Sequence, residues 1–328
     1  IHMQARDIKA ALADYDAAIR TDPDTAEAYV NKGLALMLDL PWALVLLPLP
    51  VLHALGWVLG WASFLLSSRY RRRLLAHAKQ AGYSTGVALR SVGEAGKLVA
   101  ELPRLWLGRP VTVGWEGAAH IEAAQAGGSG VLFLTPHLGC FEITAQAYAQ
   151  RFGQALEPTP GTQAQPITVL FRPPRKAWAA EVLRTARERP GLATAPTTLA
   201  GVKQLIKALK AGQAVGLLPD QVPPDGQGVW APFFGRDAYT MTLSARLAQA
   251  GRVQILLSWG ERLGWGRGYR VHVRPFDTVN GGPLSTDPLE AAAQINRAME
   301  SLVRECPAQY LWSYDRYKAP RGSAPRPR

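Results

Sequence analysis

Residues 131–142, VLFLTPHLGCFE, decide the fold, because an apolar run passes through a short turn into a helical pattern. The run Val131–Thr135 is short and apolar and is followed by Pro and Gly, which is typical of a buried strand. His137 lies in the turn, and Glu142 is expected in the first turn of the following helix. In an α/β sheet, ligands usually bind where strands end, so we expect a functional site here.

His137 is the histidine that its surroundings select as a candidate catalytic residue. Three of the six histidines have a carboxylate five residues later, so this interval alone decides nothing. His272 lies in the middle of a strand pattern, and His2 belongs to an N-terminal Ile-His-Met that resembles a cloning remnant. Within one helix, five residues would rotate two side chains about 140° apart, whereas a loop followed by a helix lets His137 and Glu142 converge.

A carboxylate beside an imidazole fixes its tautomer, so that the other ring nitrogen can take a proton from a hydroxyl or an amine. We therefore predict His137 as a general base and Glu142 as its orienting partner. The alternative is a structural histidine that a neighbouring acid satisfies. Cys140 is expected to be inert packing at the start of a helix rather than a nucleophile.

The alternation of apolar runs and helical patterns after Arg109 predicts an α/β domain with a central, mostly mixed sheet covered by helices. The expected strands are Val111–Trp115, Val131–Thr135, Ile167–Phe171, Ala214–Leu218, Val253–Ser258 and Tyr269–Val273. The expected helices are Ala118–Ala126, Phe141–Phe152, Arg175–Arg187, Thr198–Ala211, Thr242–Ala250 and Leu289–Arg304. Residues 319–328 are rich in proline and are expected to form a flexible tail.

Composition limits the classes of protein that remain. The 328 residues are 48% hydrophobic, which excludes wholesale disorder, and the two cysteines form no CxxC motif. A disulfide framework or a zinc site is therefore not expected, and a reducing compartment fits best. The net charge of +12 leaves nucleic acid, an anionic membrane surface and an acidic protein or phosphorylated substrate open as partners.

Residues 40–68 contain no charged side chain. Pro48 and Pro50 divide this segment, and its uninterrupted helical part, Val51–Leu66, is shorter than the roughly 20 residues of a straight membrane span. Its tryptophans and the RYRRR sequence that follows are typical of a membrane anchor with basic residues on the cytoplasmic side. A kinked span and a helix embedded in one leaflet both remain open, and the alternative is a buried core helix.

The N-terminal residues 1–36 resemble a fragment of a tetratricopeptide repeat, with matching positions at Ala11, Tyr15, Ala18, Pro23, Tyr29 and Gly33. Solenoid repeats need about three copies to bury a continuous core, so this fragment is not expected to form a peptide-binding array by itself. We expect a fused or residual hairpin at 1–36, a membrane-anchoring segment at 37–68 and a catalytic domain at 69–318.

The ordered motifs of the chain resemble the glycerolipid acyltransferase superfamily and, within it, the bacterial late acyltransferases of lipid A biosynthesis. TPHLGCFE is similar to the HX4D/E motif of that superfamily, and VLFRPPR places Arg172 where the superfamily has a substrate-binding arginine. GVKQLIKALKAGQAVGLLPDQ resembles the stretch that ends in its acidic third motif, at Asp220 and Gln221. GVWAPFFGRDAYTMT and PAQYLWSYDRYK also resemble the late acyltransferases, so the similarity runs from about Leu40 to Lys318.

This resemblance implies a membrane-bound O-acyltransferase at the cytoplasmic face of the bacterial inner membrane, with neither cofactor nor metal. It implies acyl carrier protein as the acyl donor, a hydroxyl of a lipid A precursor as the acceptor, and no nucleic-acid partner. Arg172, Arg175, Asp220 and Gln221 would bind substrate, and guanidinium groups in particular suit phosphates and carboxylates. The alternatives are that the two arginines are ordinary surface residues and that Asp220 caps a turn. Lysines on one expected helix offer a docking strip for the acidic donor protein, although a solvated helix face is the simpler interpretation: Lys203, Lys207 and Lys210.

Two departures from the family pattern leave the acceptor open. The family often has Asn-Trp where this chain has Cys140-Phe141, and its usual C-terminal histidine is replaced by Tyr314. A phospholipid, glycolipid or aminolipid acceptor, with acyl-CoA as the donor, is the alternative enzyme. A tetratricopeptide scaffold that binds proteins is the alternative of another class.

Overall fold

The computed structural model describes residues 17, 43–153, 165–171 and 187–320. The expected tetratricopeptide fragment at 1–36 therefore lies outside the described residues except for Ala17, and so does the expected helix Arg175–Arg187 except for its last residue. Arg172 and Arg175 are also outside the described part.

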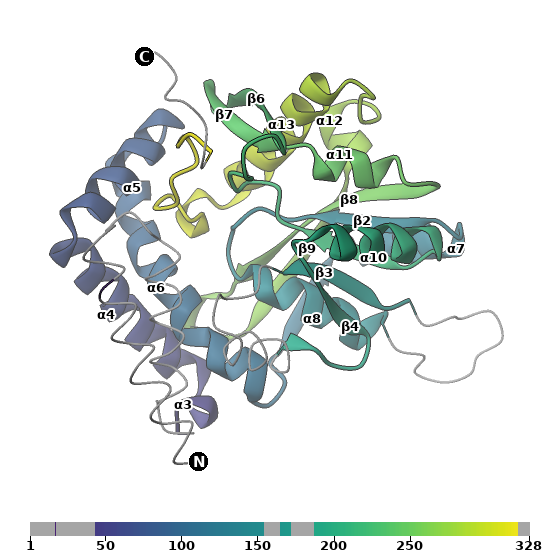
Figure 1. Ribbon diagram of the computed structural model, residues 1–328. Helices are drawn as coiled ribbons and strands as arrows, with labels where there is room; N and C mark the ends of the chain where they lie inside the picture. Colours follow the sequence, from purple (N-terminus) through teal and green to yellow (C-terminus); the bar gives the residue numbers. More distant parts are fainter. Residues whose placement is uncertain (1–16, 18–42, 154–164, 172–186, 321–328) are drawn as a thin grey trace.

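A central sheet of seven strands organises the chain, in the order β1-β9-β8-β2-β5-β3-β4 (Figure 1). All neighbouring strands are parallel except β8 and β9, so β9 and β1 run opposite to the other five. The strands are β1 Val113–Glu116, β2 Gly130–Leu134, β3 Ile167–Phe171, β4 Leu192–Pro196, β5 Ala214–Leu217, β8 Val253–Arg262 and β9 Tyr269–Pro275. The expected α/β fold with a central mixed sheet is confirmed.

Helices cover both faces of this sheet, and strand β2 shows why. Leu132 and Leu134 are buried in one hydrophobic core, and Val131 and Phe133 in the other, because successive strand side chains point to opposite faces. One core is covered by α10 Leu199–Lys210, α11 Leu243–Ala248 and α13 Pro288–Glu305, and the other by α7 Ala118–Ala126 and α8 Phe141–Arg151. These five helices correspond to five of the six that the sequence predicts.

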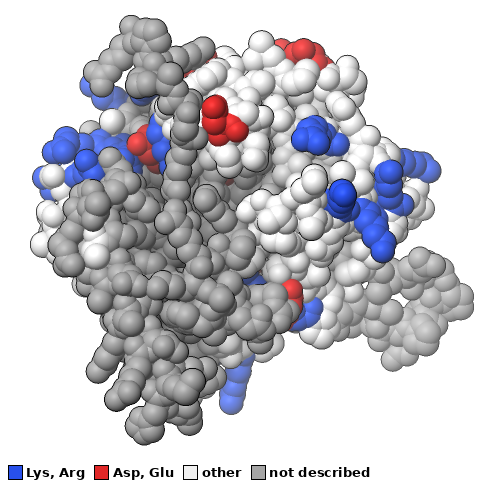
Figure 2. Space-filling view, viewed as in Figure 1, with Lys and Arg blue, Asp and Glu red and all other residues white. Residues whose placement is uncertain are grey.

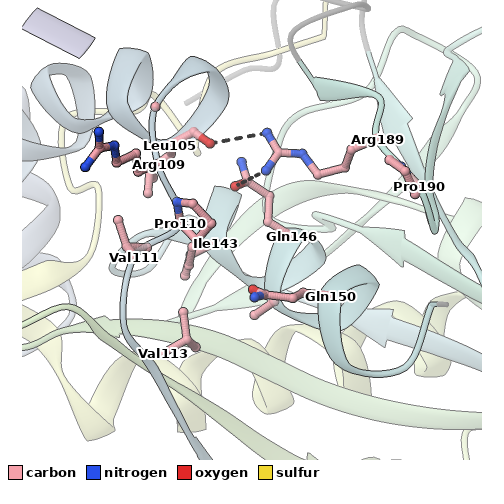
Figure 3. A pocket seen from close by; sticks show the side chains of 12 residues that line it. Leu105, Arg109, Pro110, Val111, Val113, Ile143, Gln146, Gln150, Arg189 and Pro190 are labelled. Carbon is pink, nitrogen blue, oxygen red and sulfur yellow. Dashed lines mark hydrogen bonds between the residues drawn. The ribbon is translucent and has the colours of Figure 1, made fainter. Parts of the chain in front are cut away.

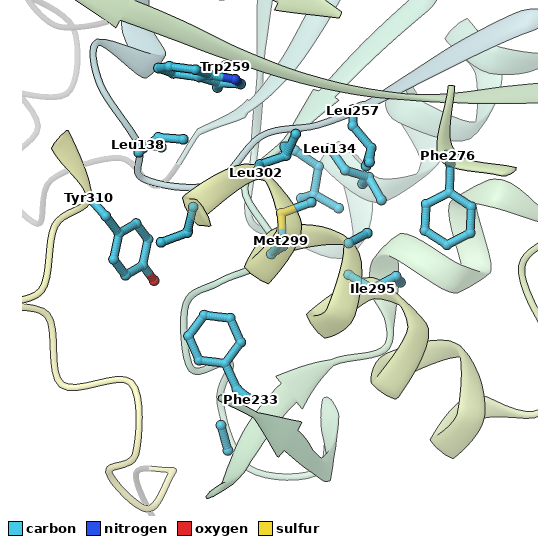
Figure 4. Packing of buried hydrophobic residues seen from close by; sticks show 14 of the residues in the cluster. Leu134, Leu138, Phe233, Leu257, Trp259, Phe276, Ile295, Met299, Leu302 and Tyr310 are labelled. Atoms are coloured by element: carbon cyan, nitrogen blue, oxygen red, sulfur yellow. The ribbon is translucent and has the colours of Figure 1, made fainter. Parts of the chain in front are cut away.

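Helix α13 fills the space between the sheet and a separate hairpin. The hairpin pairs β6 Gly228–Phe233 with β7 Arg236–Met241 in antiparallel register. Figure 4 shows Met299 and Leu302 of α13 between Leu134 and Leu257 of the sheet and Phe233 of the hairpin. The short helix α12 Phe276–Asn280 follows β9.

In the described part of the chain, four helices precede the sheet and lie together along one side of it: α3 Ala43–Leu46, α4 Leu49–Leu66, α5 Ser68–Gln80 and α6 Thr85–Leu107 (Figure 1). Helix α4 contains the expected apolar helix, extended by two residues at its start. It packs closely on α6, where a Cβ on Gly56 or Gly60 would overlap the α6 backbone. Among the described residues, α4 is the one helix long and apolar enough to cross a membrane.

Candidate active site

His137 lies at the edge of the sheet where β2 ends, in the loop that leads into α8. Glu142 is in the first turn of α8, so the strand, loop and helix occur where the sequence places them. Gly139 turns this loop with a φ of 60°, in the left-handed region that favours glycine. A Cβ at this position would overlap the carbonyl oxygen of Gly260.

A buried ion pair between Arg262 and Glu101 stabilises the loop. The Arg262 guanidinium donates to both carboxylate oxygens of Glu101 at 2.8–3.0 Å and to the carbonyl oxygen of Gly139 at 2.7 Å. Burial raises the pKa of Glu101, but the charge of Arg262 and the hydrogen bonds from His53 and Arg262 together outweigh burial and lower this pKa to about 2. Because Glu101 lies on α6, this pair fixes the loop to the N-terminal helices.

The carboxylate that contacts the His137 ring is that of Asp220. Its Oδ1 accepts from Nδ1 of His137 at 2.7 Å, and its Oδ2 accepts from the backbone N–H of the same residue at 2.8 Å. The Tyr310 hydroxyl donates to Oδ2 at 3.3 Å. Burial would raise the pKa of Asp220, which is 2% exposed, but the charge of His137 and these hydrogen bonds hold it below its usual value.

The expected pairing of His137 with Glu142 is corrected by this geometry. Glu142 accepts from the Arg187 guanidinium, with which it forms an ion pair, and from the Trp106 indole N–H at 3.2 Å. Asp220 reaches His137 because β5 pairs in parallel with β2, so the loops that follow these two strands meet at one edge. The first turn of α8 places Glu142 beside Arg187 and Trp106, and Arg187 lies 4.9 Å over the Trp106 ring.

The second ring nitrogen of His137 is directed toward Gln221. Since Nδ1 must donate to the carboxylate, Nε2 carries the free electron pair and accepts from the Gln221 amide at 3.0 Å. Gln221 is exposed, so Nε2 lies next to a position that a ligand can reach. The structure thus brings together His137, Asp220 and Gln221, three residues that the sequence singled out.

Aromatic side chains close the site on both sides of the imidazole. The Phe141 ring lies 4.8 Å from it, and the Tyr314 ring is nearly parallel to it at 6.5 Å. The Tyr314 hydroxyl accepts the backbone N–H of Val222 at 2.8 Å. Tyr314, noted in the sequence only as a departure from the expected pattern, thus forms part of the wall of the site.

Sequence reasoning did not single out Arg187, Trp106 or Tyr310 as site residues. Arg187 and Trp106 are 45 and 36 residues from Glu142 along the chain, so no local spacing indicates these contacts. Cys140 is fully buried, and burial raises the pKa of its thiol well above the usual value, which disfavours the thiolate that a nucleophile needs. Among the described residues, no cluster of His, Cys, Asp or Glu could hold a metal ion.

A cavity of about 230 Å³ lies one helical turn beyond Glu142 (Figure 3). Ile143, Gln146 and Gln150 line it from α8, and Val111 and Val113 line it from the segment that enters the sheet. Gln146 is 8% exposed, and its side-chain nitrogen has no hydrogen-bond partner among the described residues. The cavity therefore combines apolar walls with a free donor, which suits an amphiphilic molecule.

The lysines of the expected docking strip are exposed on α10. They run along the helix toward the start of β5, away from the edge at which His137 lies. These lysines are Lys203, Lys207 and Lys210. Helix α10 begins at the edge nearest the site, and Lys203 alone among the three lies within two turns of that beginning.

One family of known proteins is similar to this chain over most of its length. The family model of bacterial lipid A biosynthesis acyltransferases matches residues 31–319. The lipid A biosynthesis lauroyltransferase of Escherichia coli (strain K12) is 27% identical over 84% of this chain and 88% of its own length. The lipid A biosynthesis acyltransferase of Haemophilus influenzae (strain ATCC 51907 / DSM 11121 / KW20 / Rd) is 25% identical over 60% of this chain. The palmitoleoyltransferase of E. coli (strain K12) is 26% identical over 62% of it. The matches cover 56% and 60%, respectively, of the lengths of these last two relatives.

Proposed function

The chain belongs to the bacterial lipid A biosynthesis acyltransferase family, and we propose that it transfers a fatty acyl chain from an acyl carrier protein thioester to a hydroxyl of a lipid A precursor. The reaction would take place at the cytoplasmic face of the inner membrane. The observation that carries the proposal is the His137 imidazole, held by a buried carboxylate at Nδ1 and turned toward an exposed position at Nε2.

In this mechanism His137 is the general base. Its Nε2 takes the proton of the acceptor hydroxyl while the hydroxyl oxygen attacks the carbonyl carbon of the thioester. The π electrons of this carbonyl move onto the carbonyl oxygen. The electrons on that oxygen then re-form the C=O bond as the C–S bond breaks, and the imidazolium gives the proton to the departing thiolate. Asp220 stabilises the imidazolium and keeps the ring in one orientation, so atoms and protons balance without an acyl-enzyme.

Gln221 occupies the place of the acceptor hydroxyl until substrate binds. The amide donates to Nε2 at 3.0 Å, which is a hydrogen bond that the hydroxyl proton would replace. Once displaced, its N–H groups are free to donate to the acceptor oxygen or to a neighbouring substrate group. Gln221 is therefore proposed as a substrate-binding residue rather than as a proton carrier.

Glu142 is proposed to act through Arg187. Two of the guanidinium nitrogens donate to the Glu142 carboxylate, whereas Nη1 makes no hydrogen bond in the described part of the chain. Developing charge on the thioester oxygen needs a fixed donor, and an oriented guanidinium supplies one. Arg172 and Arg175 remain proposed substrate-binding residues on the basis of family resemblance.

The cavity beyond Glu142 is proposed to take part of the bound substrate. Its walls offer apolar contact to a hydrocarbon chain, and the free Gln146 donor can meet an ester or amide carbonyl. A chain pocket of this kind discriminates by only about 1–3 kcal/mol per methylene. The length of the transferred acyl chain must therefore be measured on the products.

The decisive experiment incubates the purified full chain with acyl carrier protein thioesters and lipid A precursor, and identifies the products by mass spectrometry. His137→Ala should lower turnover by about 10²–10⁴-fold, the usual effect of losing a general base. His272→Ala is the matched control, because His272 lies elsewhere on the sheet and pairs with Glu261. Turnover of the His137 variant near that of the wild type would exclude this mechanism, and acylation of a different lipid alone would exclude the acceptor.

A further inference from the structure

We propose that α4 lies in the plane of one leaflet of an anionic lipid bilayer, with its outer face among the acyl chains, and does not cross the membrane. The proposal rests on the membrane location proposed above but on no step of acyl transfer. The two faces of α4 differ in what they contact.

The outer face of α4 is apolar, and the described residues leave it exposed. Seven large hydrophobic side chains on this helix are 43–87% exposed: Val51, Leu55, Trp57, Val58, Leu59, Leu65 and Leu66. None of the 18 residues of α4 is an acid, a lysine or an arginine. Soluble proteins rarely expose a continuous apolar surface of this kind, and such surfaces mark contacts with membranes or proteins.

The inner face of α4 packs against α6. Leu52, Gly56, Gly60 and Phe64 are buried along it at helical spacing. A Cβ on Gly96 of α6 would overlap α4 itself, so the two backbones touch. Contact of this kind over four turns keeps α4 and α6 together as one unit.

Helix α6 cannot follow α4 across a bilayer without carrying charge into it. It bears five ionisable side chains: Arg90, Glu94, Lys97, Glu101 and Arg104. A polar contact also joins α4 to α6, because Nε2 of His53 lies 3.2 Å from Oε2 of Glu101. Charged groups are costly at the centre of a bilayer, and 18 residues span about 27 Å, less than the roughly 30 Å hydrocarbon core. If α4 lies in the plane of the leaflet, the ionisable side chains of α6 stay on the side of α4 that faces the protein, outside the hydrocarbon core.

Basic residues lie where α4 ends, which makes an anionic surface the matching partner. Helix α5 begins at Ser68 and carries five cations: Arg69, Arg71, Arg72, Arg73 and Lys79. Of these, Arg73 is paired with Asp315 at 3.2 Å, and Arg71 donates to two carbonyl oxygens at the end of α4. Figure 2 shows Lys and Arg side chains gathered at this side of the molecule. Near an anionic membrane, an exposed basic residue such as Arg72 strengthens binding about fivefold.

This orientation also brings the catalytic loop toward the lipid surface. His77 of α5 contacts the carbonyl oxygen of Trp312 through Nδ1 at 2.9 Å. One residue earlier, Leu311 donates its backbone N–H to the carbonyl oxygen of His137 at 3.1 Å. The basic helix and the loop are thus joined by one short segment, so a lipid hydroxyl at headgroup depth can meet His137.

The first test measures binding of the purified full chain to vesicles of phosphatidylglycerol and phosphatidylethanolamine. Val58→Glu, on the exposed face of α4, should weaken vesicle binding at least tenfold without changing the melting temperature. Leu289→Glu is the matched control, because Leu289 is an equally exposed hydrophobic residue on α13, and it should change binding less than twofold. Arg72→Gln should weaken binding to these vesicles about fivefold but not to neutral phosphatidylcholine vesicles. Unchanged binding of Val58→Glu would overturn the proposal.

The second test separates an in-plane helix from a span. Single cysteines replace Pro48 and Ser67, which flank α4, in a chain whose Cys306 is Ala, and sealed membrane vesicles are treated with an impermeant maleimide. Both positions should be labelled from the same side, and labelling from opposite sides would contradict the in-plane position. A His137→Ala chain should give the same pattern, which keeps this result apart from the catalytic proposal. A lipid-free dimer that Val58→Glu dissociates, with vesicle binding unchanged, would assign the face to a second copy and overturn the proposal.

Discussion

Replacing Asp220 with Asn should abolish most of the catalytic rate while leaving the fold in place. Asp220 accepts two N–H groups of His137, one from the ring at 2.7 Å and one from the backbone at 2.8 Å. An Asn side chain offers one acceptor oxygen and one NH2 group, so one of the two donors must face another donor. The ring can relieve this conflict by moving its proton to Nε2, and Nε2 then no longer accepts a proton from the acceptor hydroxyl.

The expected loss follows from that change of tautomer. Removing a general base costs about 10²–10⁴-fold in rate, and the corresponding Asp-to-Asn exchange in a serine protease lowers kcat about 10⁴-fold. The variant also loses a charge-assisted hydrogen bond at a buried site, which is worth about 1.5–3 kcal/mol of stability. We therefore expect a kcat lower by at least 10²-fold, with a KM close to that of the wild type.

Two measurements check this prediction. Transfer from acyl carrier protein thioester to lipid A precursor gives kcat and KM, and nitrogen-15 NMR of the imidazole reports which ring nitrogen carries the proton. Glu142→Gln is the control, because Glu142 contacts Arg187 and Trp106 and should leave the tautomer unchanged. A kcat of Asp220→Asn within tenfold of the wild type, or a tautomer that changes in Glu142→Gln instead, would refute the assignment of Asp220 as the orienting carboxylate.

Three further predictions concern the groups around the loop. Glu101→Gln should lower the free energy of unfolding at pH 7 by about 3 kcal/mol in urea titrations, because it breaks the buried pair with Arg262. The pKa of Glu101 is lowered from 4.5 to about 2, so the wild type should lose about 3 kcal/mol as the pH falls through this range, and the variant should not. Gly139→Ala should reduce both melting temperature and turnover, because its φ of 60° is strained for alanine and its Cβ would overlap the Gly260 carbonyl. Tyr314→Phe should cost about 1–3 kcal/mol of stability in the same titrations by leaving a backbone N–H unpaired, yet lower kcat less than tenfold because the ring remains.

Local sequence patterns predicted most of the elements because each was bounded by residues that end helices and strands. The expected strand Ile167–Phe171 and the expected helix Ala118–Ala126 have the observed bounds. Strand β4 and the β6–β7 hairpin were not expected. Leu192–Pro196 is a short edge strand that ends in proline, and the hairpin contains Pro232, so both patterns argue against strands when considered alone.

The candidate site was predictable only in part, because its contacts cross between strands. The position of His137 follows from the local strand–loop–helix pattern. Asp220 lies 83 residues later, and only the parallel pairing of β5 with β2 brings it to the ring. Asp220 was singled out in the sequence through family resemblance. Its contact with Nδ1 of His137, which makes it the proposed orienting carboxylate, is visible only in the structure. The same reasoning explains why Glu142, the nearer carboxylate along the chain, was expected in that role.

Helix α4 belongs to the fold as well as to the proposed membrane surface, and this affects how membrane attachment can be tested. Its inner face covers α6, and His53 contacts the same Glu101 that holds Arg262 and, through it, the carbonyl of Gly139. Deleting residues 1–66 would uncover that face and disturb this network, so membrane release and loss of catalytic geometry would occur together. A charge on the outer face removes only the apolar contact with lipid, because Val58 is exposed and the inner face stays packed. Substitution, rather than truncation, therefore separates the contribution of α4 to binding from its contribution to the active site.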